Sequence, residues 1–414
     1  MTAARSFLKN AGALYLVQIL AFLVPVLEIP LLARTLGVSL YGQILFCQAL
    51  AITLSLLVEY GFGINAAQQT ALAHGKKKVL NRLVSQVLLA KSMLAAPMVA
   101  LILLVWAAGW LDTYLEHIAL LGFVLAYFLA FGFSPLWYFQ GREQMALPAS
   151  LDIILRLAGL GVLAIWVQGP QDFILALPLL CVPTLLSTAG TLLWCRRQVG
   201  PLQLDFAGAW QQIVQGFHFF VYRGASNLAI AAVPVLLGLT SGKRAVGEFA
   251  PAEKLIKGMT GLGMPFLTAV FPIFSRRLQG PANAAALRLP LLVLLGVMVV
   301  ALAGTALAWW LGPWVLDTML GTGYPGAGTI YQALLALAPL RILNQSIAMV
   351  LLIPAGRSRS VSYVVLMFSL LGLGTGTTLS VFFGGIGMAA GLVGIEALLL
   401  LVMLLLARRT VRLA

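Results

Sequence analysis

Six basic side chains stand inside long apolar segments of this chain: Lys91, Arg156, Arg223, Lys254, Lys257 and Arg341. A charged residue at the centre of a lipid-exposed helix costs about 2.5–3.5 kcal/mol on insertion scales, so such residues usually line a polar path or pair with other groups. Arginine binds phosphate through parallel hydrogen bonds, and lysine binds it as a point charge. We therefore expect these six residues to bind an anionic substrate that carries phosphate.

Acidic side chains within the same segments nearly balance these cations: Glu28, Glu59, Asp152, Glu253 and Glu396. Asp152 and Arg156 are four residues apart, as are Glu253 and Lys257, so each pair lies on one helical face and can form an ion pair. Pairing of the other cations with Glu28, Glu59 or Glu396 across helices stays open. The five acids are therefore candidates either for ion coupling, through proton exchange, or for ion pairing.

The elements that carry these residues are expected to be membrane spans, because ~20 apolar residues form a helix that crosses the ~30 Å hydrocarbon layer. Twelve segments qualify: 12–33, 40–60 (which could extend to 73), 83–108, 117–139, 147–167, 173–194, 213–239, 248–274, 288–311, 327–353, 361–382 and 387–406. The composition, with 61% hydrophobic and 9% charged residues, leaves no room for a soluble domain. The sequence thus predicts an all-α integral membrane protein with twelve transmembrane helices.

The basic residues are distributed unevenly between the two sets of loops. If the N-terminus is cytoplasmic, one side holds Arg5, Lys9, Lys76, Lys77, Lys78, Arg82, Arg142, Arg196, Arg197, Arg276, Arg277, Arg288, Arg357, Arg359, Arg408, Arg409 and Arg412. The other side holds only Arg34, Lys243 and Arg244. This asymmetry follows the positive-inside rule and predicts that both termini are cytoplasmic. The net charge of +14 is dispersed through short loops, which argues against a nucleic-acid partner.

The two halves of the chain echo each other at one constant offset, close to half the chain length. Gly37, Gly42, Gln43, Gln48 and Leu50 recur as Gly242, Gly247, Glu248, Glu253 and Leu255. With six spans in each half, the copies would have the same orientation, which is the parallel-repeat architecture of transporters with a substrate site at the repeat interface. We expect an N-terminal six-helix lobe over residues 1–200 and a C-terminal six-helix lobe over residues 201–414.

Glycine-rich segments give no sign of a cofactor site. Gly321, Gly323 and Gly326 have the spacing of a dinucleotide-binding turn, but they fall in a loop between spans rather than between a strand and a helix. Gly387 and Gly391 form a GxxxG pattern, which predicts close helix packing. We expect no cofactor, no metal site and no catalytic residue, and hence no enzyme.

Several segments, taken in order, resemble one known family. They are VEYGFGINAAQQTA (58–71), PLWYFQGREQM (135–145), GFHFF (216–220), VGEFAPAEKL (246–255) and FPIFSRR (271–277). They resemble the polysaccharide biosynthesis family of Wzx-type O-antigen flippases. The resemblance implies membership of the multidrug/oligosaccharidyl-lipid/polysaccharide exporter superfamily, with two lobes facing a central cavity. It also implies an undecaprenyl-pyrophosphate-linked oligosaccharide as the substrate, moved from the cytoplasmic to the periplasmic leaflet of the bacterial inner membrane.

The resemblance covers Lys91, Arg156 and Lys254, which lie in family-like segments, whereas Arg223 and Arg341 are proposed on their chemistry alone. Expected partners are the lipid-linked oligosaccharide and the bilayer, and in addition a polysaccharide polymerase and a chain-length regulator. Two alternatives stay open: a cation-coupled drug exporter of the same superfamily and a membrane-embedded glycan polymerase or ligase. Three amide side chains could either face the sugar or bond between helices: Asn227, Asn344 and Gln345.

Overall fold

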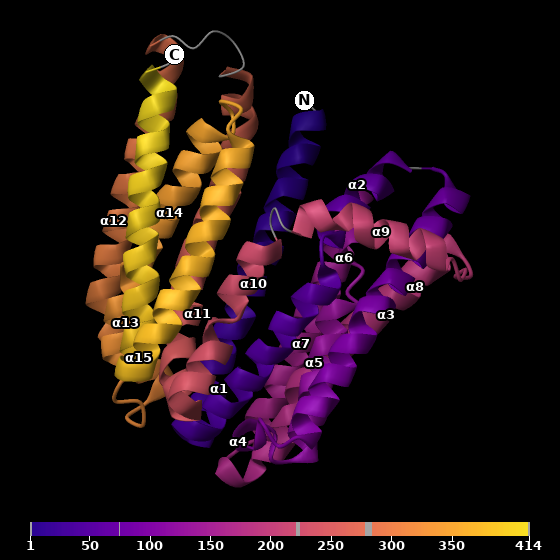
Figure 1. Cartoon of the computed structure of the whole chain (residues 1–414), viewed down its shortest axis with the longest axis vertical. Helices are drawn as coiled ribbons and strands as arrows, with labels where there is room; N and C mark the ends of the chain where they lie inside the picture. The colour runs from indigo at the N-terminus through magenta and orange to yellow at the C-terminus, as the bar shows by residue number, and fades with distance from the viewer. Residues whose placement is uncertain (1, 74, 221–223, 278–283, 413–414) are drawn as a thin grey trace. The chain divides into compact units, whose positions relative to one another are not determined.

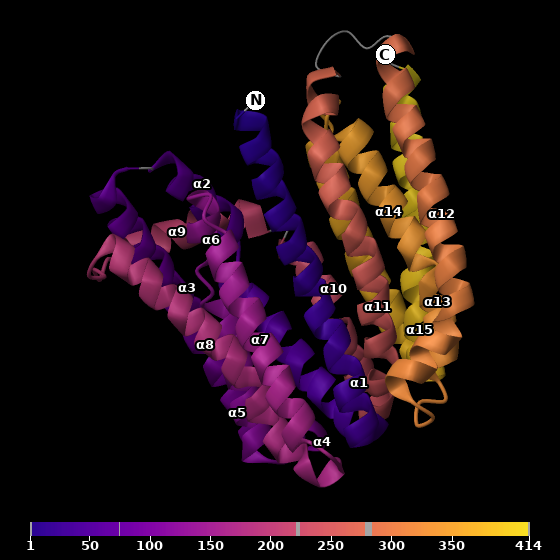
Figure 2. The ribbon, with the colours of Figure 1, turned by 180° about the vertical axis from the view of Figure 1, so that it is seen from behind.

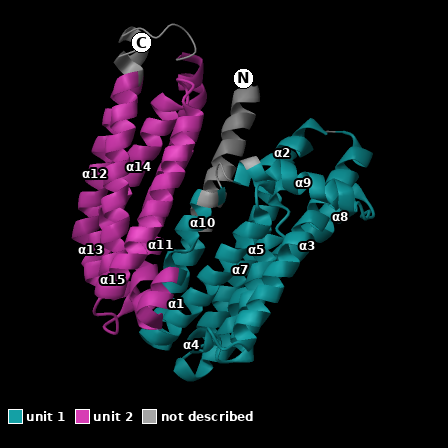
Figure 3. Ribbon diagram, in the orientation of Figure 1, with its two compact units in different colours: residues 1–235 teal, residues 236–414 magenta. Residues whose placement is uncertain are grey.

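The computed structural model describes the backbone of residues 2–73, 75–220, 224–277 and 284–412. It describes the side chains of these residues as well, except those of 2–22, 218, 225, 284–287 and 410–412. Every regular element in these ranges is a helix (Figures 1 and 2). The chain divides into two compact units, residues 1–235 and 236–414 (Figure 3). The first unit includes α9 (Phe206–Phe219), which packs on α3, and α10 (Ala225–Ala231), which packs on α1.

The first unit consists of long helices joined by short ones. Its elements are α1 (Thr2–Glu59), α2 (Phe62–Leu72), α3 (Lys77–Ala107), α4 (Asp112–Leu115), α5 (Ile118–Gly132), α6 (Leu136–Gly141), α7 (Ala146–Trp166), the 3₁₀ turn η1 (Pro170–Asp172), α8 (Phe173–Val199), α9 and α10. Helix α1 packs against α5 and α7, and α8 packs against α5 and α7. A buried aromatic run, Trp137 to Phe139 on α6, anchors a core shared with residues of α2, α3, α8 and α9.

The second unit begins inside α11 (Val233–Arg277) and continues with α12 (Ala284–Leu320), α13 (Ala327–Leu335), α14 (Leu337–Ile347), the π-helical turn η3 (Ala348–Leu352) and α15 (Ser358–Arg412). Helix α14 packs against α12 and α15, and α13 also packs against α15. The core at one end joins Leu351 and Leu352 of η3 to Val361, Leu399 and Met403 of α15.

Nine helices in the described residues are long and apolar enough to span a membrane. Three of them are Leu23–Glu59, Ser226–Arg277 and Ser358–Arg409, and each covers parts of two predicted spans. The last two are 52 residues long, far more than a ~30 Å hydrocarbon layer needs at about 1.5 Å per residue. The coarse prediction of an all-helical, multi-pass membrane protein is thus confirmed.

A glycine with positive φ interrupts each of these three long helices. Gly37 in α1 has φ 76° and ψ 170°, Gly242 in α11 has φ 84° and ψ 172°, and Gly384 in α15 has φ 58° and ψ −139°. This backbone region is essentially restricted to glycine. Gly37 and Gly242 are the first matched pair of the sequence repeat, so the two halves share a local conformation at equivalent positions.

The segment predicted as the seventh span, 213–239, starts inside α9, which is a separate amphipathic helix. One face of α9 is buried and carries Ala209, Gln212 and Ile213. Hydrophobic residues at helical spacing stay exposed on its other flank: Phe206, Trp210, Val214 and Phe217. Figure 1 shows α9 running crosswise to α3. Gln211 and Gln215 are also exposed and add a polar stripe to α9, which makes the helix amphipathic.

The GxxxG pattern in the last predicted span marks close packing, as expected. A Cβ atom at Gly391 would lie 2.6 Å from the Cα atom of Gly376, and one at Gly387 would collide with the carbonyl oxygen of Leu379. The two segments of α15 on either side of Gly384 therefore approach each other backbone to backbone, which only glycine permits.

Candidate functional site

Lys91 of α3 and Glu59, the last residue of α1, form a buried ion pair in the first unit. The Lys91 Nζ atom lies 2.5 Å from the Glu59 Oε2 atom, and it also donates a hydrogen bond to the carbonyl oxygen of Ser134 at 3.1 Å. The Lys91 side chain is completely buried, whereas 30% of the Glu59 side chain is exposed. The cation is therefore satisfied by protein groups, and its carboxylate partner is the one that reaches an accessible surface.

Arg156 belongs to a second polar cluster in the same unit. Its Nε atom lies 3.0 Å from the Asp152 Oδ2 atom, as the i, i+4 spacing predicts, and 26% of the side chain is exposed. The guanidinium carbon lies 5.6 Å from the centroid of the Phe131 ring, which stacks on Tyr127. A partly exposed arginine held between a carboxylate and an aromatic face is well placed to exchange its carboxylate for another anion.

Glu28 is tied to this cluster through Gln48 and Tyr127. The Gln48 side-chain amide donates hydrogen bonds to the Glu28 Oε1 atom at 3.2 Å and to the Tyr127 hydroxyl oxygen at 3.3 Å. The Tyr127 hydroxyl in turn donates to the carbonyl oxygen of Leu180. This chain of polar groups joins α1, α5 and α8 within segments that are otherwise apolar.

The second unit holds two more intramembrane ion pairs. Lys257 lies 3.0 Å from Glu253 on α11, and Glu253 is the more buried partner, with 4% of its side chain exposed against 37% for Lys257. The Arg341 Nε atom of α14 lies 3.8 Å from the Glu396 Oε2 atom of α15. Glu396 also accepts a hydrogen bond from the Asn344 side-chain amide at 3.0 Å. Asn344 thus takes the helix-to-helix role that the sequence left open.

The structure gives less detail about the two remaining cations. Lys254 is partly buried on α11 next to Glu253. Arg223 lies outside the described residues. All four of the predicted cations whose pairing partners are described therefore face a carboxylate of their own unit, and their role in binding substrate stays a prediction.

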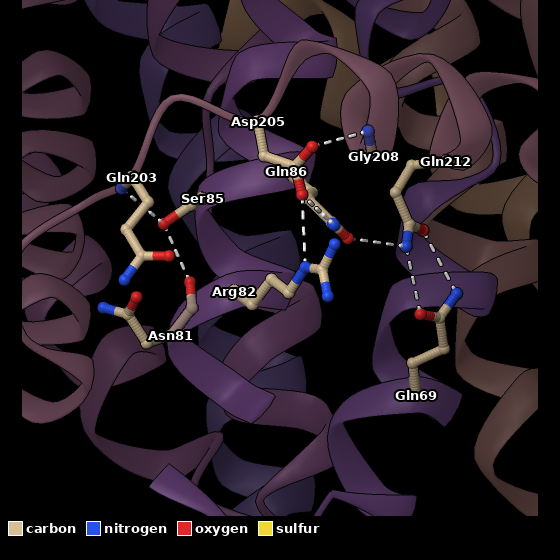
Figure 4. A network of polar contacts seen from close by, with 9 residues as sticks. All are labelled: Gln69, Asn81, Arg82, Ser85, Gln86, Gln203, Asp205, Gly208 and Gln212. Atoms are coloured by element: carbon tan, nitrogen blue, oxygen red, sulfur yellow. Dashed lines mark hydrogen bonds and ion pairs between the residues drawn. The ribbon is translucent and has the colours of Figure 1, made fainter. Parts of the chain in front are cut away.

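A polar network fastens α9 to α2 and α3 (Figure 4). The Asp205 carboxylate accepts hydrogen bonds from the Gln86 side-chain amide at 2.7 Å and from the Gly208 backbone N–H at 2.8 Å, and it pairs with Arg82 at 3.1 Å. These groups, with the Gln86 amide first, hold the pKa of Asp205 below its ordinary value. Gln212 adds hydrogen bonds to Gln69 and Gln86. The network positions the segment that precedes the second unit.

An apolar groove of about 720 Å³ lies in the second unit between α11, α12 and α14. Ala338 and Ile342 of α14 contribute to its wall, and Gly263, Gly296 and Gly304 leave it wide. Among the described residues that line the groove, Thr305 alone has a side-chain hydroxyl, which donates a hydrogen bond to the carbonyl oxygen of Ala301 on its own helix. The groove is therefore mostly apolar, and Ile342, which follows Arg341 in the chain, forms part of its wall.

Sequence reasoning found the two i, i+4 pairs but could not assign the partners of Lys91 and Arg341. It also missed Gln48 and Tyr127 as polar links. In the sequence these two residues are visible only as a glutamine and a tyrosine inside apolar segments. Such a pattern fits many structural roles, so it did not single them out.

Comparison with known proteins places the chain in a family. The model of the family described as "Polysaccharide biosynthesis protein" matches residues 7–278. The chain belongs to this family. It is 26% identical over 408 residues to a protein of Escherichia coli (strain K12) named as a presumed O-antigen transporter, and the alignment covers 97% of each chain. A Shigella dysenteriae protein of the same name is 25% identical, with 96% of this chain and 98% of that one covered.

Solved structures give the fold. The lipid II flippase MurJ in an inward closed conformation superposes with a TM-score of 0.71 at 14% identity, covering 96% of this chain and 87% of that one. An inward-facing multidrug resistance transporter of the MATE family, in the MOP superfamily, gives a TM-score of 0.67 at 14% identity, with 95% and 98% covered. The chain therefore has the fold of MOP-superfamily transporters.

Proposed function

We propose that this family member is a flippase that moves undecaprenyl-pyrophosphate-linked oligosaccharide repeat units from the cytoplasmic to the periplasmic leaflet. The observation that carries the proposal is similarity over nearly the whole length to proteins named for O-antigen transport. Charges and unpaired hydroxyls lose their hydration in hydrocarbon, so a pyrophosphate-linked sugar cannot cross unaided. A polar path that supplies cations and hydrogen bonds removes this barrier.

The arrangement of the intramembrane charges supports a substrate with an anionic head group. Arg156 and Arg341 face carboxylates at the edge of accessible surface, with 26% and 14% of their side chains exposed. Phosphate can replace a carboxylate at a guanidinium because both accept its parallel N–H donors. We assign substrate binding to Lys91, Arg156, Arg223, Lys254, Lys257 and Arg341, and ion coupling or pairing to Glu28, Glu59, Asp152, Glu253 and Glu396. The apolar groove between α11, α12 and α14 supplies a surface for the polyprenyl chain.

The proposed architecture has twelve crossings in two six-helix lobes, 1–200 and 201–414, around a central cavity that alternates between the two leaflets. Matching backbone breaks at Gly37 and Gly242 support the parallel repeat. The proposed location is the bacterial inner membrane with both termini on the cytoplasmic side, and the proposed partners include a polysaccharide polymerase and a chain-length regulator.

The alternative function is cation-coupled drug export. A multidrug transporter of the MATE family shares the fold, so this alternative must be tested. A binding site for cationic drugs needs a surplus of acids, yet Glu59, Asp152, Glu253 and Glu396 each face a basic residue. This pairing favours the flippase. Transport of a cationic dye by the purified protein in vesicles would support drug export. If the dye is not transported, the result would support the flippase.

Complementation tests the proposal directly. A strain that lacks its native flippase should regain surface polysaccharide when it expresses this chain. Several strains with different repeat units should be used, because the sugar is not specified by the arguments above. Failure in all of them, with the chain present in the membrane at normal abundance, would contradict the proposal.

A further inference from the structure

Glu396 of α15 makes contact with two side chains of α14. Its Oε2 atom faces the Arg341 Nε atom at 3.8 Å. Its Oε1 atom accepts a hydrogen bond from the Asn344 Nδ2 atom at 3.0 Å, and the same Nδ2 atom donates to the backbone carbonyl oxygen of Glu396 at 3.2 Å. Among the charged groups that the structure describes, the Arg341 guanidinium faces this carboxylate.

Asn344 is left with an unsatisfied acceptor. The residue is 4% exposed, and its Oδ1 atom is buried without a hydrogen-bond donor. Leaving a buried polar atom unsatisfied costs about 1–3 kcal/mol. A carboxylate has no proton to donate, so Glu396 in its ionised form cannot relieve this cost.

A proton on Glu396 would supply the missing donor. An amide and a carboxylic acid pair through two hydrogen bonds, one from the amide N–H and one from the acid O–H. The bond from Asn344 Nδ2 to Glu396 Oε1 is one of these two and is already made. The second would run from a protonated Oε2 to Asn344 Oδ1, and Oε2 is the atom that now faces Arg341.

We propose that Glu396 is a proton-binding group that decides whether Arg341 is available to an anionic head group. When Oε2 is ionised, Arg341 faces the carboxylate. When Oε2 takes a proton from water, its O–H donates to Asn344, the negative charge disappears, and the guanidinium is left to bind phosphate. The proton returns to water when the site ionises again. The identity of the anion rests on the proposed function; the proton site itself does not.

The long Arg341 contact fits this exchange. Charge-assisted hydrogen bonds between a guanidinium and a carboxylate are usually about 2.7–2.9 Å long, so a separation of 3.8 Å describes a pair held loosely. Linkage makes the effect reciprocal, since a proton that favours anion binding is itself bound more tightly when the anion is present. Anion binding should therefore be accompanied by proton uptake.

The first experiment detects the proton without any substrate. Infrared difference spectra of the purified full chain in lipid nanodiscs, recorded across pH 5–9, should contain the carbonyl band of one protonated carboxylic acid that disappears in Glu396→Gln. In Arg341→Gln the band should persist to higher pH, because the cation that favours the ionised form is gone. Glu248→Gln is the matched control, since Glu248 also faces an arginine, Arg244, in this unit. It should leave the band unchanged.

The second experiment measures binding of undecaprenyl pyrophosphate by calorimetry in two buffers with different ionisation enthalpies. In the wild type, binding should take up a proton and weaken by up to about tenfold per pH unit above the midpoint of the titration. Glu396→Gln should bind without pH dependence, because its side-chain amide can donate to Asn344 at every pH. An unchanged pH dependence in Glu396→Gln, or an unchanged infrared band, would overturn the inference.

The two experiments separate this inference from the proposed function. If no pyrophosphate lipid binds at any pH while the Glu396 band titrates and responds to Arg341→Gln, the flippase proposal fails and the proton site stands. If the lipid binds without proton uptake, the flippase proposal survives and this inference fails. Thermal unfolding of each variant shows whether it is folded before it is scored.

Discussion

Lys91 and Glu59 form an ion pair in which only the acid reaches an accessible surface. The two charged atoms are 2.5 Å apart, with the lysine side chain fully buried and the glutamate side chain 30% exposed. A buried charge that loses its partner destabilises a fold more strongly than the intact pair stabilises it. The pair therefore makes the end of α1 depend on α3.

Replacing Glu59 by leucine should reduce the free energy of unfolding by about 3–5 kcal/mol, because Lys91 is left buried without a counter-charge. The double variant Glu59→Leu, Lys91→Leu should recover most of this loss. Thermal unfolding in detergent measures both. Arg82→Gln is the control, since Arg82 is 68% exposed in its pair with Asp205 and such surface pairs are worth at most about 1 kcal/mol. Equal losses in the single and double variants would contradict the prediction.

Replacing Arg156, Lys254 or Arg341 by glutamine should impair transport while membrane abundance stays near that of the wild type. A lost hydrogen bond to a charged group costs about 1.5–3 kcal/mol, which is roughly ten- to a hundredfold in affinity. Surface polysaccharide and membrane abundance should be measured together, at expression low enough for transport to limit. Arg359→Gln, at an exposed position, is the control. Normal amounts of surface polysaccharide in all three variants would contradict the proposal that these cations bind substrate.

A reporter that is active only in the periplasm tests the orientation. Fused after Arg412 it should be silent, and inserted near Asp172 it should be active, because the basic residues concentrate on the side that holds the termini. The Asp172 carboxylate accepts backbone hydrogen bonds from Gln168 and Gly169, so the insertion should follow Asp172 rather than precede it. The opposite pattern of activity would reverse the assignment of the two faces.

Alanine at Gly37 or Gly242 should cost about 1–3 kcal/mol, which is the strain of a side chain in a backbone region reserved for glycine. A Cβ atom at either position would meet no atom within 4 Å, so the cost is conformational and not steric. Gly161→Ala is matched, because Gly161 is also surrounded by open space but lies within the regular helix α7. It should be neutral or slightly stabilising. Comparable losses in all three variants would contradict the prediction.

Ionised Asp205 should stabilise the attachment of α9 at neutral pH. Its pKa is lowered in the folded chain, chiefly by the Gln86 amide and the Gly208 N–H. This stabilisation is complete above the unfolded value of about 3.9 and is lost as the pH falls through the lower folded value. The difference in melting temperature between wild type and Asp205→Asn should therefore be constant from pH 8 to pH 5 and shrink below roughly pH 4. A difference that already shrinks near pH 6 would contradict this assignment.

The sequence by itself determined the features that depend on local spacing. Apolar length predicted a multi-pass helical membrane protein, and the i, i+4 spacing predicted the contacts of Asp152 with Arg156 and of Glu253 with Lys257. Both depend only on the rise and period of one helix. The GxxxG pattern at Gly387 and Gly391 likewise gave the close packing of α15.

Only the tertiary structure decided which charges meet across helices. Lys91 pairs with Glu59 and Arg341 with Glu396, partners that are 32 and 55 positions away along the chain. The register and rotation of one helix against another depend on how all their side chains pack, and neither is encoded by the period of a single helix. The same packing left Asn344 Oδ1 without a donor. An unsatisfied atom of this kind is a property of a finished fold and has no signature in the sequence.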